Sequence, residues 1–397
     1  MVSKPGIDYE ELLPHFDMWD PAHEKIKWDV LAYAREKCPV AHTDADGGGQ
    51  YMVFRYEDVR RILEDPYTFS SKGVAPRPSP VGLNPLDADP PYQPDLRKIL
   101  NPLFTRTFLT KFEPELRKNA AELIDGFIGN GRFDFVREFA GPFVGNALSR
   151  AVFNEDDPVR MAHAQDVVVR VAVEGTDEAY GELVALSVQY LAEQTENPNP
   201  ANEVMNAIST GTVEGGRHLT EMERLGVVAV LFLGGLDTTR GALGGIAHQL
   251  AIHPELETRL RDPAWIRQDM DELIRLTSPV GCLGRTATKD VEVGGLLIKA
   301  GEQILVRFDS ANRDETHFED ASHLRFDLRR GGHVGFGLGL HRCLGAHFAR
   351  IQIAIAFDEL FKRITNLRLA DPEAEVHWAA GIANGPESLP LVFDAVQ

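Results

Sequence analysis

The sequence predicts a mainly α-helical fold with a smaller part built from strands. Apolar residues recur at a spacing of three and four through residues 105–210 and from Thr220 to His253, as they do on the buried faces of helices. Strand-like patterns are confined to short stretches such as 51–55 and 286–298. A hydrophobic content of 43% and a charged content of 25% are those of a globular chain with a sizeable core.

Composition also limits the possible functions and locations. The formal net charge of −19 argues against a nucleic-acid partner, because phosphate binding relies on clustered Lys and Arg. Three scattered cysteines are too few for a disulfide framework, which favours a reducing compartment. The N-terminus has no apolar signal core, and the longest near-apolar run, Val227 to Leu236, is far shorter than the roughly 20 residues of a membrane helix. We expect a soluble, cytoplasmic protein without a membrane span and, since no linker divides it, one domain over residues 1–397.

The first hundred residues contain scaffold elements followed by a long loop. Residues 22–38 predict an amphipathic helix, 51–55 a strand and 56–64 a short helix. Between Pro76 and Pro94 the chain carries seven of its 24 prolines, which exclude a continuous helix. Long loops inside compact domains often bind ligands or cover a site, and we expect such a role here.

The segment from Thr220 to His253 is predicted to form one long helix that spans the core. Thr220 and Glu223 have the spacing of a capping box, which marks the helix start. The interior holds Gly234 and Gly235, each of which costs about 1 kcal/mol relative to alanine in a helix. Two missing side chains open a groove along the helix, so we expect a functional reason for them.

A glycine-rich loop around Cys343 is the most informative stretch of the chain. The sequence HVGFGLGLHRCLGAHFAR, residues 333–350, sets this cysteine between flexible glycines and an apolar helical pattern. At a helix N-terminus, free N–H groups and the helix dipole favour a thiolate, which is a metal ligand. Two other interpretations are open: a buried cysteine beside a glycine turn, and zinc held by Cys343 with His333, His341 and His347.

The segment FGLGLHRCLG matches the pattern F-G-x-G-x-[HR]-x-C-x-G, and the chain thereby resembles the cytochrome P450 family in its soluble bacterial form. The resemblance implies a cytochrome P450 fold, with a large helical region and a smaller β-rich lobe. It also implies that haem b is bound with Cys343 as the proximal iron ligand. Phe336 would pack beside the sulfur, and the backbone at Gly337 and Gly345 would lie against the haem.

Upstream, GGLDTT at residues 234–239 resembles the family's [AG]-G-x-[DE]-T-T oxygen-binding motif. The resemblance assigns Gly234 and Gly235 to a groove for dioxygen. Thr238 would hold dioxygen and a water by hydrogen bonds, while Asp237 would carry protons inward from solvent. Without the resemblance, the same residues fit a helix kink with a locally satisfied threonine.

Haem-edge contacts are implied by two further segments. DPPYQPDLRKIL, residues 89–100, resembles the family's D-P-P-x-[HQ]-x-x-x-R, in which Arg97 would pair with a haem propionate. Gln93 stands in place of the commoner histidine of that motif. Arg285, which follows VGCLG, and His341, two residues before the cysteine, would also bind propionates.

A buried brace behind the haem loop is implied by the pair Glu272 and Arg275, which have the family's E-x-x-R spacing. In the family this pair joins a second arginine, for which the sequence offers Arg325 or, alternatively, Arg329. An isolated pair of this spacing is usually a surface ion pair worth less than about 1 kcal/mol.

Substrate contacts are expected at four places around the haem. The segment from Val167 to Leu191 would form the roof of the pocket, and Arg77 in the proline-rich loop is a candidate for binding a carboxylate, with a solvated loop arginine as the alternative. Small and aliphatic residues would face the substrate from the segment after Pro279 and from the C-terminal hairpin, namely Val280, Cys282, Leu283 and Ile382.

The activity implied by the resemblance is that of a haem-thiolate monooxygenase. It would insert one atom of dioxygen into a C–H or C=C bond of an apolar small molecule of terpenoid, steroid-like or fatty-acyl type. No flavin or iron–sulfur motif is present, so ferredoxin and ferredoxin reductase would supply electrons to the monomer. The expected docking face is basic and contains Arg342, Arg350, Lys98 and Arg106. The alternatives are a peroxide-driven peroxygenase of the same fold and a non-catalytic haem-thiolate sensor.

Overall fold

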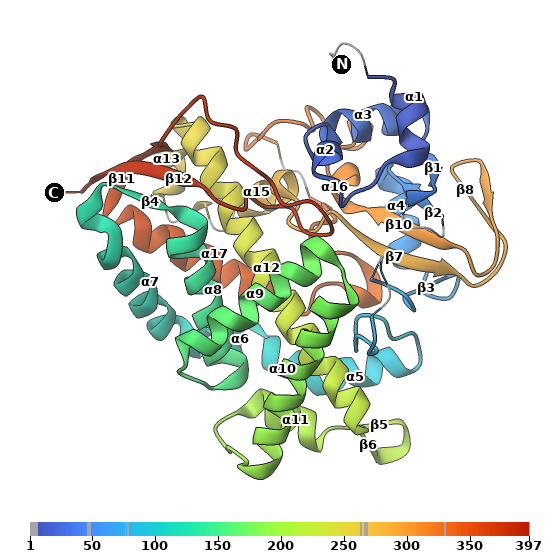
Figure 1. Cartoon of the computed structure of the whole chain (residues 1–397), viewed down its shortest axis with the longest axis horizontal. Helices are drawn as coiled ribbons and strands as arrows, with labels where there is room; N and C mark the ends of the chain where they lie inside the picture. Colours follow the sequence, from blue (N-terminus) through green and yellow to red (C-terminus); the bar gives the residue numbers. More distant parts are fainter. Residues whose placement is uncertain are drawn as a thin grey trace.

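Helices make up most of the described chain, and most strands gather at one end of the molecule (Figure 1). The computed structural model describes residues 7–45, 49–75, 77, 79–262, 264–265, 269–328 and 331–396. The helices are α1 (Tyr9–Leu12), α2 (Pro21–Glu24), α3 (Lys27–Lys37), α4 (Tyr56–Glu64), α5 (Tyr92–Leu100), α6 (Arg106–Leu109), α7 (Glu113–Phe127), α8 (Gly141–Leu148), α9 (Pro158–Glu174), α10 (Asp177–Glu196), α11 (Glu203–Thr210), α12 (Glu221–Ile252), α13 (Glu255–Leu260), α15 (Met270–Thr277), α16 (Phe308–Ala311) and α17 (Ala346–Phe361).

The largest sheet has five strands in the order β1-β2-β10-β7-β3. In it β10 pairs parallel with β2 and antiparallel with β7. A three-stranded sheet, β11-β12-β4, lies at the opposite end of the molecule (Figure 1). The strands are β1 (Val40–Thr43), β2 (Gln50–Val53), β3 (Phe69–Ser70), β4 (Arg132–Asp134), β5 (Thr212–Val213), β6 (Arg217–His218), β7 (Cys282–Ala287), β8 (Val291–Val293), β9 (Leu296–Ile298), β10 (Gln303–Arg307), β11 (Ile364–Leu369) and β12 (Pro390–Ala395). The prediction of a mainly helical protein with a smaller β-rich part is confirmed.

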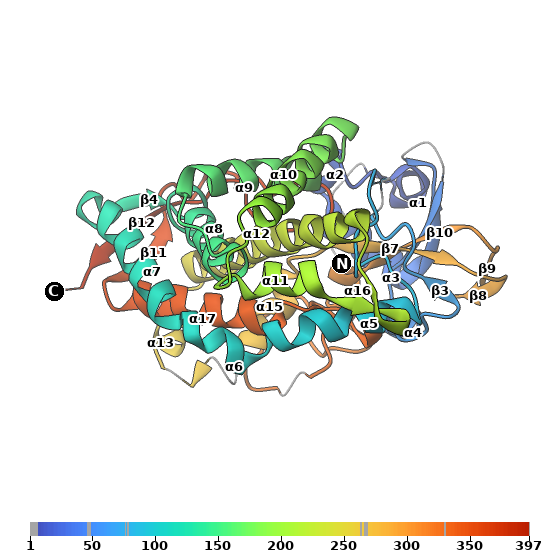
Figure 2. The same ribbon diagram turned by 90° about the horizontal axis from the view of Figure 1, so that it is seen from below.

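The long helix α12 runs through the middle of the molecule, with α9 and α10 on one side and α17 on the other (Figure 2). It begins with the predicted capping box, in which Glu223 N–H donates to Thr220 Oγ1 and Thr220 N–H donates to a Glu223 carboxylate oxygen. By length and composition α12 is apolar enough to cross a membrane, but 72% of its most apolar window is buried inside the protein. The burial identifies α12 as a core helix.

Glycines in α12 allow two loops to pack directly against its backbone. A Cβ at Gly226 would lie 1.9 Å from the carbonyl oxygen of Gly82, which belongs to the proline-rich loop. A Cβ at Gly241 would lie 2.6 Å from the carbonyl oxygen of Asn384, in the loop before β12. The proline-rich segment contains no helix or strand among its described residues before α5 begins, as predicted. The two loops therefore pack against α12 at positions 15 residues apart.

The predicted helix over residues 22–38 is wrong in one respect, because it consists of two helices. Ile26 between them has φ −118° and ψ 4°, which is not a helical conformation. The break turns Lys27 into the protein, where its Nζ lies 2.6 Å from Glu24 and 2.7 Å from Asn384 Oδ1. A buried lysine needs such partners, and this requirement outweighs the helical propensity of the segment.

Candidate active site

A cavity of about 310 Å³ lies beside the middle of α12. Most of the side chains that line it are apolar and come from the proline-rich loop, α9, α12, the segment before β7 and the loop before β12. The polar side chains that line it are Gln93, Arg97, Tyr180, Asp237, Thr238, Thr239, Arg285, His341, Cys343 and Gln352. Most of the polar residues that the sequence predicts at a site are thus brought together around one cavity.

The loop before α17 presents Cys343 to this cavity. Gly337 and Gly339 have φ values of 64° and 63°, a conformation that glycine adopts without strain. A Cβ at Gly339 would also lie 2.6 Å from Leu63 O, so the loop fits tightly against the end of α4. Cys343 N–H donates to Phe336 O at 2.8 Å, which closes the loop. The side chain of Cys343 is left open toward the cavity, three residues before α17 begins.

The protonation of Cys343 is controlled by opposing effects. Burial raises the pKa of the thiol, whereas the backbone N–H of Gly345 and the charges of Arg97 and Arg342 act in the opposite direction. The N–H contribution at the helix start acts in the predicted direction, toward the thiolate, and burial acts against it. A bound cation would supply the missing stabilisation of the thiolate.

The zinc interpretation finds no support in the described part of the chain. No group of three or more His, Cys, Asp or Glu residues is placed there to hold a metal ion. His333 is instead turned to Asp271, at 3.7 Å, and its Nδ1 accepts a hydrogen bond from Gly335 N–H. His333 therefore orients the loop and does not act together with Cys343.

One end of the cavity is basic and lacks a balancing acid. Neither Arg97 nor Arg285 makes an ion pair with a described residue, and burial lowers the pKa of both, that of Arg285 to about 10. Burial, with the nearby charge of Arg285, lowers the pKa of His341 to about 4, and its Nε2 has no hydrogen-bond partner among the described residues. A buried arginine, Arg285, a half-buried arginine, Arg97, and an unsatisfied imidazole fit an anionic group with two carboxylates, which is what the propionates of haem b provide.

Gln93 lies at the same end of the cavity and is 1% exposed. Its Nε2 donates to Leu340 O at 2.8 Å, three residues before the cysteine. Its Oε1 has no partner in the described part of the protein. The side chain therefore braces the cysteine loop and leaves a free acceptor beside the cavity.

The two glycines in the middle of α12 differ in their surroundings. A Cβ at Gly234 would meet no atom within 4 Å, so this position opens into the cavity. A Cβ at Gly235 would lie 2.6 Å from Leu148 Cδ1. Both glycines line the cavity as predicted, but they differ in packing, because the missing side chain of Gly235 also makes room for Leu148 from α8.

The acid and the alcohol that follow these glycines already have partners within the helix. Thr238 Oγ1 donates to Gly234 O at 2.8 Å. Asp237 is 3% exposed, and its Oδ1 accepts from Arg240 Nε at 3.0 Å and from Arg240 NH2 at 2.5 Å. Asp237 Oδ2 has no partner among the described residues. One carboxylate oxygen is therefore clamped, and the other is free to accept a hydrogen bond.

The buried brace behind the cysteine loop is centred on Arg275, which is fully buried. Its guanidinium binds both carboxylate oxygens of Glu272, at 2.8 and 2.9 Å, and donates to three backbone carbonyls. Arg325 reaches Glu272 through its backbone N–H at 2.9 Å, while its guanidinium pairs with Asp320 and Asp327 near the surface. The prediction that the side chain of Arg325 joins the brace is therefore wrong, and Arg329 lies outside the described residues.

Comparison with known proteins agrees with this geometry. Residues 266–389 match the family model for cytochrome P450. Cytochrome P450 107B1 from Saccharopolyspora erythraea is 30% identical over 96% of this chain and 98% of the relative, and a steroid C26-monooxygenase from Mycolicibacterium smegmatis is 29% identical over 99% and 97%. The chain belongs to the cytochrome P450 family. The solved structure of a mutant of P450 EryK with erythromycin B covers 94% of this P450, at a TM-score of 0.84 and 27% identity.

Membership of the family defines the cofactor and the class of reaction. The protein is a P450 monooxygenase, an oxidoreductase, and its cofactor is haem b. The free thiol of Cys343, the unbalanced Arg97 and Arg285 and the open position at Gly234 all surround one cavity, so the residues present fit the haem.

Three of the four residues predicted to face a substrate line the cavity. Val280, Leu283 and Ile382 line the cavity. Cys282 is fully buried on the other face of β7, with its Sγ 3.4 Å from Met18 Sδ, so the prediction that it faces the substrate is wrong. Neighbouring residues of a strand point to opposite faces, and Cys282 and Leu283 cannot both face one cavity.

The roof of the cavity lies within the predicted segment, and Arg77 lies outside the cavity lining. Val168, Val171, Ala172 and Tyr180 contribute the roof from α9 and α10. Arg77 donates to Glu174 O at the end of α9 and stacks on Trp19, with its guanidinium carbon 4.1 Å from the ring centre. Arg77 therefore ties the proline-rich loop to the roof.

Arg240 was not predicted as a site residue, but its guanidinium binds Asp237 in the structure. It clamps the carboxylate of Asp237 from a position one helical turn later and is itself 9% exposed. The sequence could have indicated this contact, because Asp237 and Arg240 have i, i+3 spacing on a helix that is predicted to be buried.

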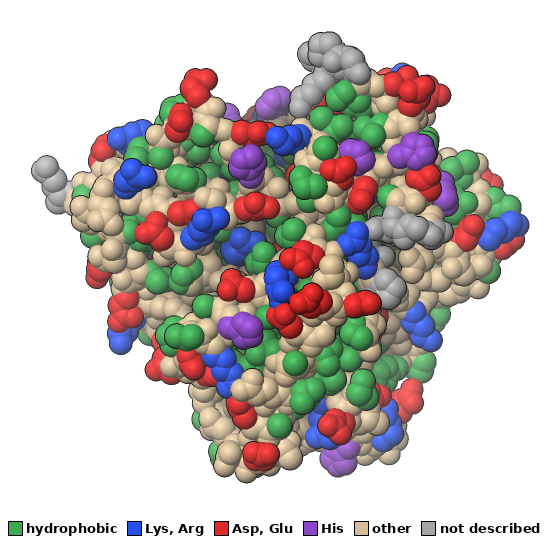
Figure 3. All heavy atoms as spheres, in the orientation of Figure 1, with side chains coloured by type: hydrophobic (Ala, Val, Ile, Leu, Met, Phe, Trp, Pro, Cys, Tyr) green, Lys and Arg blue, Asp and Glu red, His purple; other side chains and the backbone are tan. Residues whose placement is uncertain are grey.

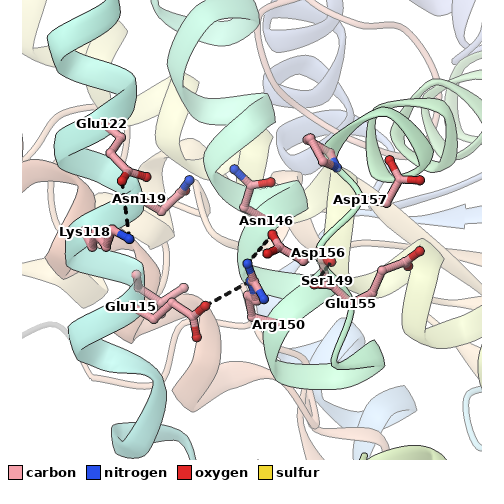
Figure 4. Close-up of a pocket in the computed structure, with 12 residues that line it drawn as sticks. Glu115, Lys118, Asn119, Glu122, Asn146, Ser149, Arg150, Glu155, Asp156 and Asp157 are labelled. Atoms are coloured by element: carbon pink, nitrogen blue, oxygen red, sulfur yellow. Dashed lines mark hydrogen bonds and ion pairs between the residues drawn. The ribbon is translucent and has the colours of Figure 1, made fainter.

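A second pocket, of about 190 Å³, lies between α7, α8 and the start of α9 (Figure 4). Arg150 sits between Glu115, at 2.9 Å, and Asp156, while Lys118 pairs with Glu122 at 3.6 Å. These ion pairs neutralise the charges of Arg150 and Lys118, so the pocket is a polar surface site whose cations already have acidic partners.

Two of the four predicted docking cations have acidic partners. Lys98 Nζ lies 2.6 Å from Asp95, and Arg350 NH2 lies 2.7 Å from Asp271. Figure 3 shows the face of the molecule on which α10 lies. On this face basic and acidic side chains are interspersed.

Arg342 and Arg106 are the remaining predicted docking cations, and both are exposed. They gather with Arg350 around His347, whose pKa is lowered by burial and by these three charges. A cluster of positive charge therefore lies next to the cysteine loop in a protein whose net charge is −19.

Proposed function

We propose that this P450 hydroxylates or epoxidises an apolar small molecule of terpenoid, steroid-like or fatty-acyl type. The observation that carries the proposal is the apolar wall of the cavity that also contains Cys343. From α9, the segment before β7 and the loop before β12, the lining consists of aliphatic residues and one proline. Such a wall favours an uncharged ligand, because burial of an unpaired charge costs several kcal/mol.

The chain's own residues divide the work of binding and proton transfer. Haem b, when bound, supplies the activation of dioxygen and the transfer of one oxygen atom. Cys343 would be its iron ligand, and Arg97, Arg285 and His341 would hold its propionates. The aliphatic wall would exclude water from the reacting carbon, which limits unproductive release of reduced oxygen.

Proton delivery is assigned to Asp237 and Thr238. Asp237 Oδ1 is held by Arg240, so the free Oδ2 would accept a hydrogen bond from a water in the cavity. Thr238 Oγ1 donates to Gly234 O and keeps its lone pairs for a second bond on the cavity side. This acid–alcohol pair supports the use of dioxygen over a peroxide-driven reaction.

The electrons are proposed to come from a ferredoxin and its reductase. The cluster formed by Arg106, Arg342 and Arg350 supports docking of an acidic partner on the side of the cysteine loop. We further propose that residues 1–397 work as one domain and as a monomer in the cytoplasm. Contacts of α12 with loops from both ends of the chain support the single domain.

A ligand screen followed by turnover tests the proposed function. Apolar terpenoids, steroids and fatty acyl compounds are titrated against the ferric holoenzyme, and a shift of the Soret band to shorter wavelength reports binding. For a ligand that binds, turnover with ferredoxin, its reductase and labelled dioxygen is expected to give a product with one labelled oxygen atom. Product formation with peroxide alone, and none with dioxygen, would contradict the proposal.

A further inference from the structure

Tyr180 is the sole polar side chain that the described residues of α9 and α10 contribute to the cavity lining. The residues beside it in the roof, Val168, Val171 and Ala172, are aliphatic. The other polar residues around the cavity lie on α5, α12, β7, the cysteine loop and α17, where the haem-binding and proton-transfer roles are concentrated. A hydroxyl group on an otherwise apolar roof needs a separate explanation.

The hydroxyl of Tyr180 has no protein partner in the described part of the chain. The residue as a whole is 2% exposed, but its oxygen is not one of the fully buried polar atoms that lack a partner, so the hydroxyl borders the open space of the cavity that Tyr180 lines. Tyr190, on the same helix, shows the usual solution, because its buried hydroxyl donates to a Glu155 carboxylate oxygen. The contrast indicates that the hydroxyl of Tyr180 is kept for a ligand in the cavity.

Arg77 determines which kind of ligand group Tyr180 suits. Burial raises the pKa of Tyr180, with the charge of Arg77 acting in the opposite direction, so the hydroxyl keeps its proton at neutral pH and can donate. Arg77 does not line the cavity, since its guanidinium stacks on Trp19 and binds Glu174 O. A ligand at the roof therefore meets a neutral donor and not a cation, which favours a neutral acceptor over a carboxylate.

We infer that Tyr180 donates a hydrogen bond to a carbonyl oxygen of the substrate and so sets its orientation in the cavity. The substrate class is then an apolar molecule with one neutral carbonyl at the end that faces α10, and the carbon to be oxidised at the end that faces Cys343. This inference rests on the proposed function and adds to it the chemical group that the roof recognises.

The test compares a ketone with its parent hydrocarbon in three forms of the holoenzyme. Dissociation constants of 2-decalone and of decalin are measured by calorimetry for the wild type, Tyr180→Phe and Tyr190→Phe. The ratio of the two constants removes the difference in water solubility between the ligands. In Tyr180→Phe the affinity for the ketone relative to that for the hydrocarbon is expected to fall by about three- to tenfold, which is the effect of losing one neutral hydrogen bond. Tyr190→Phe removes a hydroxyl outside the cavity and is expected to leave the ratio as in the wild type.

Other outcomes overturn the inference. An unchanged ratio in Tyr180→Phe, or a wild type that does not bind decalone, shows that the roof does not recognise a carbonyl. The wild type could instead bind decalin-2-carboxylate more tightly than decalone, and Tyr180→Phe could lose this preference. That result would show that the hydroxyl of Tyr180 binds a carboxylate and not a neutral carbonyl. The proposed function fails by a different measurement, namely the absence of a thiolate signature in the reduced carbon monoxide spectrum.

Discussion

Within five residues, the middle of α12 contains an open space, a packing contact, a clamped acid and an alcohol. Gly234 opens into the cavity, and Gly235 makes room for Leu148. Asp237 gives one oxygen to Arg240, and Thr238 binds the backbone of Gly234. Substitutions at neighbouring positions are therefore expected to have different consequences.

Alanine at the two glycines should separate ligand space from packing. Gly234→Ala is expected to stabilise α12 by about 1 kcal/mol, because no atom lies near the new methyl group, and to weaken carbon monoxide binding to the reduced protein. Gly235→Ala is expected to be less stable than Gly234→Ala by about 1–2 kcal/mol, since Leu148 must move. Denaturant unfolding measures the stability of both variants. Equal stabilities would contradict the difference in packing between Gly234 and Gly235.

Removal of the Thr238 hydroxyl should separate oxygen consumption from product formation. In Thr238→Ala, dioxygen is still consumed, but the fraction converted to product is expected to fall by about tenfold or more, because a positioned proton donor is lost. Thr238→Ser keeps the hydroxyl and is expected to retain most of the coupling. Product and peroxide are measured against oxygen uptake, and an unchanged yield in Thr238→Ala would remove Thr238 from the relay.

At the scale of elements, α17 carries the cysteine loop at one end and an ion-pair cluster at the other. Glu359 is 5% exposed and binds Arg117 of α7, Lys362 and Arg363, at 2.9, 2.6 and 2.9 Å. Burial acts to raise the pKa of Glu359, but the three cations outweigh it and lower the pKa to about 2. This carboxylate therefore fastens α17 to α7.

The pH dependence of stability should show this cluster. The folded-state pKa of Glu359 lies below the ordinary value of 4.5, so its contribution is complete above that value and is lost as the pH falls from 4.5 toward 2. Glu359→Gln is expected to cost about 1–2 kcal/mol at pH 7, since screening at the partly exposed cations reduces the effect. Asp358→Asn, which loses one contact of 3.4 Å, should cost less. Denaturant unfolding between pH 7 and pH 3 measures the free energy of unfolding of each variant. The role of Glu359 would be refuted if the difference in this free energy between Glu359→Gln and the wild type did not become smaller below pH 4.5.

Local sequence patterns predicted most helices and strands correctly. The errors arose where the position of a side chain depends on contacts between segments that are distant in the sequence. The capping box at Thr220 and the bounds of α4 follow from neighbouring residues alone. Cys282 was misassigned because the strand alternation of β7 decides which residue faces the cavity. Arg325 was misassigned because its backbone reaches Glu272 and its side chain does not. The break at Ile26 depends on partners of Lys27 that lie far away in the sequence.

At the scale of the whole molecule, a positive cluster lies beside the cysteine loop of an acidic protein. The net charge is −19, yet Arg106, Arg342 and Arg350 surround His347. A local potential of opposite sign to the net charge would guide the proposed acidic partner to this face.

Charge reversal in this cluster should slow reduction by ferredoxin. Arg342→Glu is expected to lower the rate by about tenfold at low ionic strength, with a smaller effect at high salt. Arg368→Glu is a suitable control, because β11 follows the far end of α17, a helix of 16 residues or about 24 Å. Stopped-flow reduction measures the rates, and equal rates in Arg342→Glu and the wild type would place the docking site elsewhere.

The most direct test of the account is the spectrum of the reduced protein with carbon monoxide. In the proposed site, Cys343 is open to the cavity, is followed by the Gly345 N–H and is the thiolate ligand of haem b. The wild type is expected to show the strongly red-shifted Soret band of thiolate ligation, and Cys343→Ala, reconstituted with haem, is expected to lack it. The same red-shifted band in Cys343→Ala would contradict the assignment.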